Sequence, residues 1–162
     1  MVLNSSYLVG NSPVWGEVDP ITTTGSKRGK VIEIPADIRD QMVEHALAAV
    51  PNEACGLLAG SDGRVERFYP MRNADESQTT YRLDPREQFR VFNEIEGKGW
   101  ELSGIFHSHT HTEAYPSETD RQQAFYPDAH YVLVSLADPS SPSVRAFTIV
   151  DGVIQEQEAR IA

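Results

Sequence analysis

From Lys30 onward, short apolar segments alternate with longer segments in which apolar residues recur at helical spacing. Short apolar runs between turn residues are typical of buried strands, whereas apolar residues four positions apart are typical of one helix face. We therefore predict strands at residues 31–34, 54–59, 65–69, 102–106, 131–136 and 144–150 and after Asp151–Gly152, and helices from 35 to 50, from 84 to the glycines at 97 and 99, and from 118 to 125. This order predicts an α+β fold in which helices flank a mixed β-sheet.

Two of these helices are predicted from the spacing of their apolar residues. The first begins at Pro35, which suits an initial helical turn, and its apolar stripe consists of Ile38, Met42, Ala46 and Val50. The second begins with the capping residue Asp84, and its apolar face consists of Phe89, Phe92 and Ile95. Each helix should bury this face against the sheet.

The chain is long enough to bury one hydrophobic core. It has 162 residues, 40% of them hydrophobic, and lies below the size at which chains usually divide. We predict one domain over residues 30–162 and a flexible tail over residues 1–29, which follow neither strand nor helix period. Docking of the tail on its own domain or on a neighbouring subunit is left open by the apolar residues Tyr7, Leu8, Val9, Val14 and Trp15.

Charge and cysteine content exclude several classes of partner and location. The net charge of −10 argues against nucleic acid, because that affinity depends on clustered Lys and Arg. The single Cys55 excludes an intramolecular disulfide, and its apolar surroundings predict a buried thiol that is a poor nucleophile. We expect a cytoplasmic protein with no signal peptide and no membrane span. A homodimer is left open.

Two histidines and an aspartate stand at a spacing that suits a metal site. His107 and His109 follow the apolar run 102–106, and side chains two positions apart in a strand point to one face. Asp120 can bring a carboxylate to the same ion. Zinc accepts two His and one Asp, and three protein ligands leave a fourth position for water. The spacing predicts a hydrolytic zinc site, with the isolated Glu53 as part of it.

Each of these residues also has a simpler interpretation. Ser117 and Asp120 form the pattern of a capping box at a helix start, a role that is compatible with metal binding. Glu53 alone would be a solvated carboxylate at a strand end. His111 would become a third imidazole ligand if the strand ran on. We expect the strand to end at His109 instead, so that His111 lines the substrate groove.

Three motifs carry a resemblance to a known family. They are E-A-C-G-L-L-A-G from Glu53, H-S-H-T-x-T-E-A-Y-P-S-x-T-D from His107, and P-D-A-H-Y-V-L-V-S from Pro127. Over about residues 30–155 the chain resembles the JAMM (MPN) metalloproteases. Within that family it is most similar to bacterial Mec-type peptidases, which release cysteine from the C-terminus of a small ubiquitin-like sulfur carrier.

This resemblance implies an MPN fold, a peptidase activity and the role of each site residue. One zinc ion per chain would be held by His107, His109 and Asp120. The general base would be Glu53, and the Ser117 hydroxyl would stabilise the oxyanion. Residues expected near the substrate are His111, Thr112 and Tyr115.

The resemblance also implies a partner. The substrate would be a small ubiquitin-like sulfur carrier whose C-terminal Gly–Gly carries an appended cysteine. Two alternatives are left open. One is cleavage of other ubiquitin-like conjugates or peptides, and the other is a non-catalytic MPN scaffold that only binds partners. The complete set of metal ligands with the glutamate argues against the scaffold.

Overall fold

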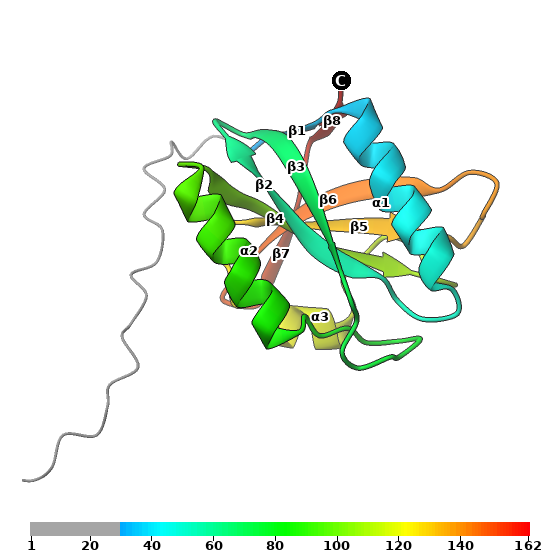
Figure 1. The fold of residues 1–162 in the computed structure, drawn as a ribbon. Coiled ribbons are helices and arrows are strands. Elements are labelled where there is room, and N and C mark those ends of the chain that lie inside the picture. Colours follow the sequence, from blue (N-terminus) through cyan, green and yellow to red (C-terminus); the bar gives the residue numbers. More distant parts are fainter. Residues whose placement is uncertain (1–29) are drawn as a thin grey trace, which may run out of the picture.

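A computed structural model describes residues 30–162, so the predictions for the tail, residues 1–29, lie outside the described residues. The described chain forms an eight-stranded sheet in the order β7-β6-β5-β4-β2-β3-β1-β8 (Figure 1). The strands are β1 (Ile32–Ile34), β2 (Cys55–Ser61), β3 (Arg64–Met71), β4 (Glu101–His109), β5 (His130–Ser135), β6 (Ser143–Val150), β7 (Val153–Gln157) and β8 (Ala159–Ile161). The helices are α1 (Ala36–Ala49), α2 (Pro85–Gly97) and α3 (Glu118–Gln122). The predicted α+β class is confirmed.

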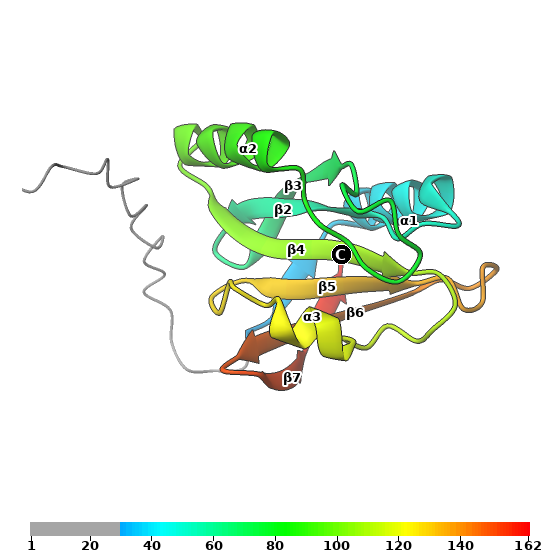
Figure 2. The same ribbon diagram turned by 90° about the horizontal axis from the view of Figure 1, so that it is seen from below.

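The sheet is mixed, as predicted. At its centre β4 pairs in parallel with β5 and antiparallel with β2, and Figure 2 shows these strands side by side. The strands β6 and β7 continue from β5 in antiparallel pairing. A parallel pair needs a crossover connection, and between β4 and β5 this connection carries α3. The connection therefore brings α3 near the end of β4.

Helices cover both faces of the sheet, and alternate residues of one strand belong to different apolar clusters. On one face Phe106 of β4 packs in a cluster with Met42 of α1. On the other face the preceding residue, Ile105, packs in a cluster with Val91 and Ile95 of α2. Because side chains alternate along a strand, His107 and His109 of β4 lie on the same face as Ile105, the face that α2 covers.

The predicted apolar face of α2 is partly wrong. The buried residues are Val91 and Ile95, whereas Phe89 is 69% exposed. Residues 91 and 95 are one helical turn apart, so they share a face that Phe89 does not share. The predicted stripe of α1 is correct at its three buried residues, Ile38, Met42 and Ala46. It is wrong at Val50, which follows the last helical residue and is exposed.

The ends of the chain's later elements also differ from the prediction. The helix α3 ends at Gln122 rather than at residue 125. A final strand, β8, follows β7 and was not predicted. It pairs in parallel with β1 through Ala159, Arg160 and Ile161, a partner far away in the sequence. A three-residue strand has no periodicity that distinguishes it from a loop.

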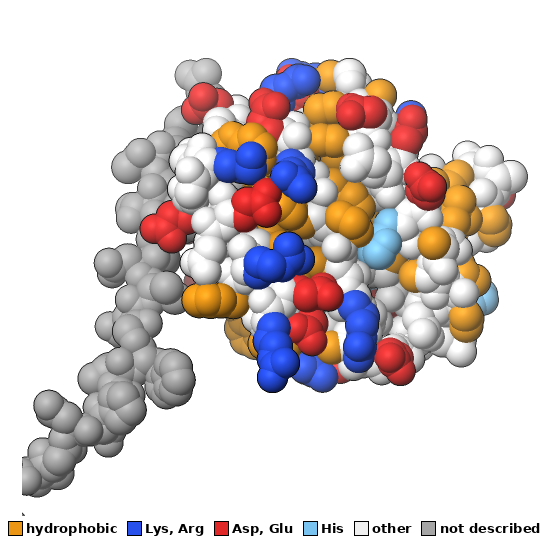
Figure 3. All heavy atoms as spheres, in the orientation of Figure 1, with side chains coloured by type: hydrophobic (Ala, Val, Ile, Leu, Met, Phe, Trp, Pro, Cys, Tyr) orange, Lys and Arg blue, Asp and Glu red, His pale blue; other side chains and the backbone are white. Residues whose placement is uncertain are grey.

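Charges of both signs share the surface. On the face seen in Figure 3, Lys and Arg side chains lie among Asp and Glu side chains. One exposed pair joins Arg67 Nη1 of β3 to Glu94 Oε1 of α2 at 2.9 Å. In the part of the chain that the structure describes, no helix is long and apolar enough to cross a membrane.

Candidate metal centre and active site

Two imidazoles project from the end of β4. The strand ends at His109, and the Nε2 atoms of His107 and His109 are 3.2 Å apart. Both side chains are buried, His107 completely. The prediction that the strand stops at His109 is confirmed. His111 therefore leaves the face of the two histidines, and its Nδ1 lies 2.8 Å from the Thr110 hydroxyl.

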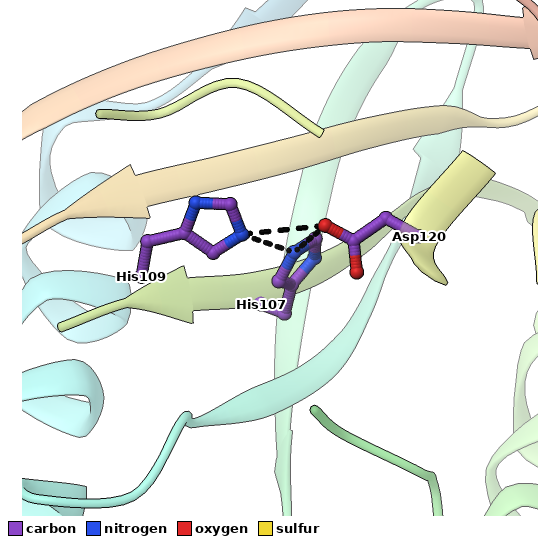
Figure 4. Close-up of side chains that lie close together, drawn as sticks. All are labelled: His107, His109 and Asp120. Carbon is purple, nitrogen blue, oxygen red and sulfur yellow. Dashed lines mark hydrogen bonds and ion pairs between the residues drawn. The ribbon is translucent and has the colours of Figure 1, made fainter. Parts of the chain in front are cut away.

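A carboxylate reaches the same point from α3. Asp120 Oδ2 lies 3.1 Å from Nε2 of His107 and 3.3 Å from Nε2 of His109, as Figure 4 shows. The same oxygen accepts a hydrogen bond from the Ser117 backbone N–H at 2.8 Å, while the Ser117 hydroxyl accepts one from the Asp120 N–H. This is the capping box. The cap fixes the direction in which the carboxylate points.

The three atoms have the spacing of a zinc site with one open position. They form a triangle with sides of 3.1, 3.2 and 3.3 Å. Zinc bonds of about 2.0–2.1 Å in tetrahedral geometry separate neighbouring ligands by about 3.3 Å. His107, His109 and Asp120 could therefore hold a metal together. Their nitrogen and oxygen donors are those that zinc accepts in catalytic sites.

The protonation states of two of these groups favour metal binding. Burial alone would raise the pKa of Asp120, but hydrogen bonds with His107 and His109 hold it well below its usual range. Burial lowers the pKa of His107, so its imidazole stays neutral. Burial would also lower the pKa of His109, but bonds to Asp120 and to the Glu113 carbonyl raise it. A histidine nitrogen must be deprotonated to bind a metal, so the affinity of this site for a metal should fall as the pH decreases.

Glu53 lies beside this cluster at the entrance of β2. The pairing of Cys55 with His107, continued by two residues, sets Glu53 opposite His109. Its side chain is buried, and Oε2 has no hydrogen-bond partner among residues 30–162. Burial raises the pKa of the carboxyl to about 8, and the charge of Asp120 adds to this rise. Such a group can take up and release a proton near neutral pH.

A cavity of about 240 Å³ opens next to Glu53 and His109. Its lining consists of Glu53, Gln78, Thr79, His109, Thr110, His111, Thr112 and Ser117. Two residues that were predicted to lie near the substrate, His111 and Thr112, belong to this lining. The third, Tyr115, does not belong to it. The ring of Tyr115 packs edge-to-face on Phe147 at 5.4 Å, with the Arg145 guanidinium over it.

Sequence reasoning missed two polar residues that hold Glu53 in place. The buried Asn73 donates from Nδ2 to the Glu53 carbonyl at 3.1 Å. The hydroxyl of Ser108, between the two histidines, accepts from the Ala54 N–H at 2.8 Å. The sequence position of Ser108 could have indicated this role, because a polar residue in a buried strand should have a hydrogen-bond partner. Asn73 lies in a polar loop without period, so nothing in the sequence distinguished it.

The single cysteine takes no part in this chemistry. Cys55 is fully buried, and burial raises the pKa of its thiol to about 12. The thiolate that a cysteine nucleophile requires is therefore absent at neutral pH. This agrees with the prediction that Cys55 is a poor nucleophile.

The chain is similar to a known protein family and to several characterised proteins. The chain matches the family "Prokaryotic homologs of the JAB domain" (Prok-JAB) over residues 35–150. A CysO-cysteine peptidase from Mycobacterium tuberculosis is 49% identical over 133 residues, which cover 81% of this chain and 91% of that protein. A desampylase from Haloferax volcanii is 38% identical over 111 residues, which cover 64% of this chain and 80% of that protein.

The fold has a counterpart among solved structures. A JAB1/MPN domain protein from Archaeoglobus fulgidus has a TM-score of 0.54 and 20% sequence identity, over 80% of this chain and 99% of that one. This likeness confirms the predicted MPN fold. The family match runs from the residue before α1 to the last residue of β6, and it contains Glu53 and the three clustered side chains. The chain belongs to the prokaryotic JAB family and is a metallopeptidase of the JAMM type.

Proposed function

We propose that this chain is a zinc peptidase that hydrolyses the amide bond after the C-terminal glycine of a small ubiquitin-like sulfur carrier and releases cysteine. One observation carries the proposal. The buried carboxyl of Glu53, with Oε2 unpartnered among the described residues, lies beside three side chains spaced for an open metal site. The 49% identity to a CysO-cysteine peptidase supports the choice of substrate.

The residues that would hold the ion are His107, His109 and Asp120. A zinc ion there would lower the pKa of a water in the fourth position to about 7. Glu53 accepts a proton from the attacking water and delivers it to the leaving amine. In the metal-free fold burial raises the pKa of this carboxyl to about 8. The positive charge of a bound ion would lower that pKa, so that the carboxylate is available to accept a proton near neutral pH. Glu53 is thus first a base and then an acid.

Ser117 stabilises the oxyanion that forms as water attacks the carbonyl. Its hydroxyl oxygen already accepts a hydrogen bond from the Asp120 N–H at 3.1 Å, so its own proton is free to be donated. Ser117 also belongs to the lining of the cavity. One such donor contributes about 100- to 1000-fold to turnover. A serine nucleophile is not needed for this reaction.

The small cavity favours a slim substrate segment. Its lining is mostly short or uncharged polar side chains, among them Thr79, Thr110 and Thr112, which fit a glycine tail that enters in extended form. Tight binding of so short a segment requires contacts elsewhere on the carrier, because remote contacts supply the energy that positions the scissile bond. The body of the carrier is therefore part of what the enzyme recognises.

We expect the intact carrier–cysteine adduct to be cleaved at least about 100-fold faster than a free Gly–Gly–Cys peptide, since the peptide lacks these remote contacts. Mass spectrometry measures both reactions as the loss of one cysteine residue. A carrier that ends in Gly–Gly–Ala tests whether the leaving residue matters. Equal rates for adduct and peptide would refute recognition of the carrier. Faster cleavage of another ubiquitin-like conjugate would favour the broader protease activity.

A further inference from the structure

The two histidines at the metal centre are held in different ways. Nδ1 of His109 lies 2.8 Å from the Glu113 carbonyl oxygen. A hydrogen bond of this kind on the second ring nitrogen is the usual device that orients a metal-binding histidine. For His107, no group in residues 30–162 bonds to Nδ1, although the ring is completely buried. Within these residues, the orientation of the His107 ring therefore depends on another contact.

An aromatic ring lies against His107 instead. The Tyr81 ring stacks on the imidazole with 4.4 Å between ring centroids and 19° between ring planes. This close, nearly parallel contact prevents the imidazole from turning about its Cβ–Cγ bond. The face of a tyrosine ring is also electron-rich and attracts positive charge. An imidazole that donates its lone pair to a metal becomes more positive, so the stack favours the metal-bound form.

The loop between β3 and α2 is built to hold Tyr81 at this point. The Asn73 side chain bonds to both neighbours of Tyr81, since Nδ2 donates to the Thr80 carbonyl at 2.9 Å and Oδ1 accepts from the Arg82 N–H at 3.2 Å. The same Nδ2 donates to the Glu53 carbonyl. One buried amide thus ties the backbone at Tyr81 to the backbone of the general base.

We propose that Tyr81 is a positioning residue for His107. Its stacked ring orients the His107 imidazole, as the hydrogen bond to Nδ1 orients that of His109. The inference rests on the proposed function, because it requires that His107 binds zinc. Loss of a partner that orients a ligand usually weakens metal binding by about 10- to 100-fold. Tyr81 is expected to contribute on this scale through its ring face. Its hydroxyl is not required.

Zinc affinity tests the proposal directly. The zinc affinity of the full chain is measured by competition with a chromophoric chelator, for the wild type, Tyr81→Phe and Tyr81→Leu. We expect Tyr81→Phe to stay within about threefold of the wild type, because it keeps the ring face, and Tyr81→Leu to bind zinc about 10- to 100-fold more weakly. Tyr81→Met, which also lacks a ring, gives the same comparison if the leucine variant does not fold.

A matched control separates positioning from general stability. Phe68 belongs to the cluster on the other face of the sheet, where its ring centroid lies 5.3 Å from that of Phe106. Phe68→Leu removes this ring and should leave zinc affinity unchanged. The visible spectrum of bound cobalt reports the ligand geometry, and it should change in Tyr81→Leu only. Wild-type affinity and spectrum in Tyr81→Leu, or an equal loss in Phe68→Leu, would overturn the proposal. A wild type that binds no zinc would instead refute the metal site itself.

Discussion

Glu53→Gln is expected to lower turnover of the carrier–cysteine adduct by about 100-fold or more, the usual scale of general acid–base catalysis. The amide has the shape of the carboxyl but cannot accept the proton of the attacking water. Zinc should stay bound at one ion per chain, because Glu53 lies outside the group of His107, His109 and Asp120. Steady-state rates and metal content on the same preparation measure both effects. Full activity in Glu53→Gln would remove Glu53 from the mechanism.

The stability of the same variant gives an independent check on the environment of Glu53. In the metal-free fold the carboxyl has a pKa of about 8, raised from 4.5 by burial. At pH values between 4.5 and about 8, the folded state therefore holds a proton that the unfolded state has lost. The free energy of unfolding falls as the pH rises through this range. Glutamine has no such proton to lose. Metal-free Glu53→Gln should thus be more stable than the wild type at pH 8, and the difference should vanish below about pH 4.5.

Asp120→Asn is expected to lose zinc and activity while it keeps the fold. The asparagine oxygen can still accept the hydrogen bond from the Ser117 N–H that closes the cap of α3, but the charge that attracts the ion is gone. His109→Ala removes a ligand without touching this cap. Each variant should bind zinc more than about 100-fold more weakly than the wild type. This loss exceeds the one expected when only a residue that orients a ligand is removed. Chelator competition measures this affinity, and circular dichroism checks the fold.

His111→Ala is the matched control for these ligand variants. The residue lines the cavity and stands two positions after His109, but it lies outside the metal-binding group. Zinc affinity should therefore match that of the wild type, although substrate turnover can fall. Full zinc occupancy in folded Asp120→Asn and His109→Ala would contradict the ligand assignment. Loss of zinc in His111→Ala would mean that the third imidazole takes part.

Local patterns explain how the sequence alone brings together the residues of the candidate metal centre. The strand period alone sets His107 and His109 on one face, and a capping box alone fixes the direction of Asp120. Both rules act over a few residues. Glu53 is more than fifty positions from the histidines, and in the sequence only the motif around it, not a physical rule, connects it with them. Its place opposite His109 depends on the antiparallel pairing of β2 with β4.

The features that were missed depend on contacts between distant segments. Tyr81 and Asn73 lie in a loop whose path is set by a buried amide and by the bridge between Asn73 and Leu83, neither of which leaves a periodic signal. The strand β8 forms because its backbone pairs with the free edge of β1. The exposed Phe89 shows the opposite error, since a large apolar residue on a helix is not always buried.

Metal removal and restoration on the proposed substrate test the central claim most directly. The chain is stripped of metal with a chelator, and the carrier–cysteine adduct is followed by mass spectrometry before and after one equivalent of zinc is returned. The metal-free chain should leave the adduct intact, and zinc should restore the loss of a single cysteine residue from the terminal glycine. Cleavage at full rate without metal, or an intact adduct with the zinc-loaded enzyme, would contradict the account.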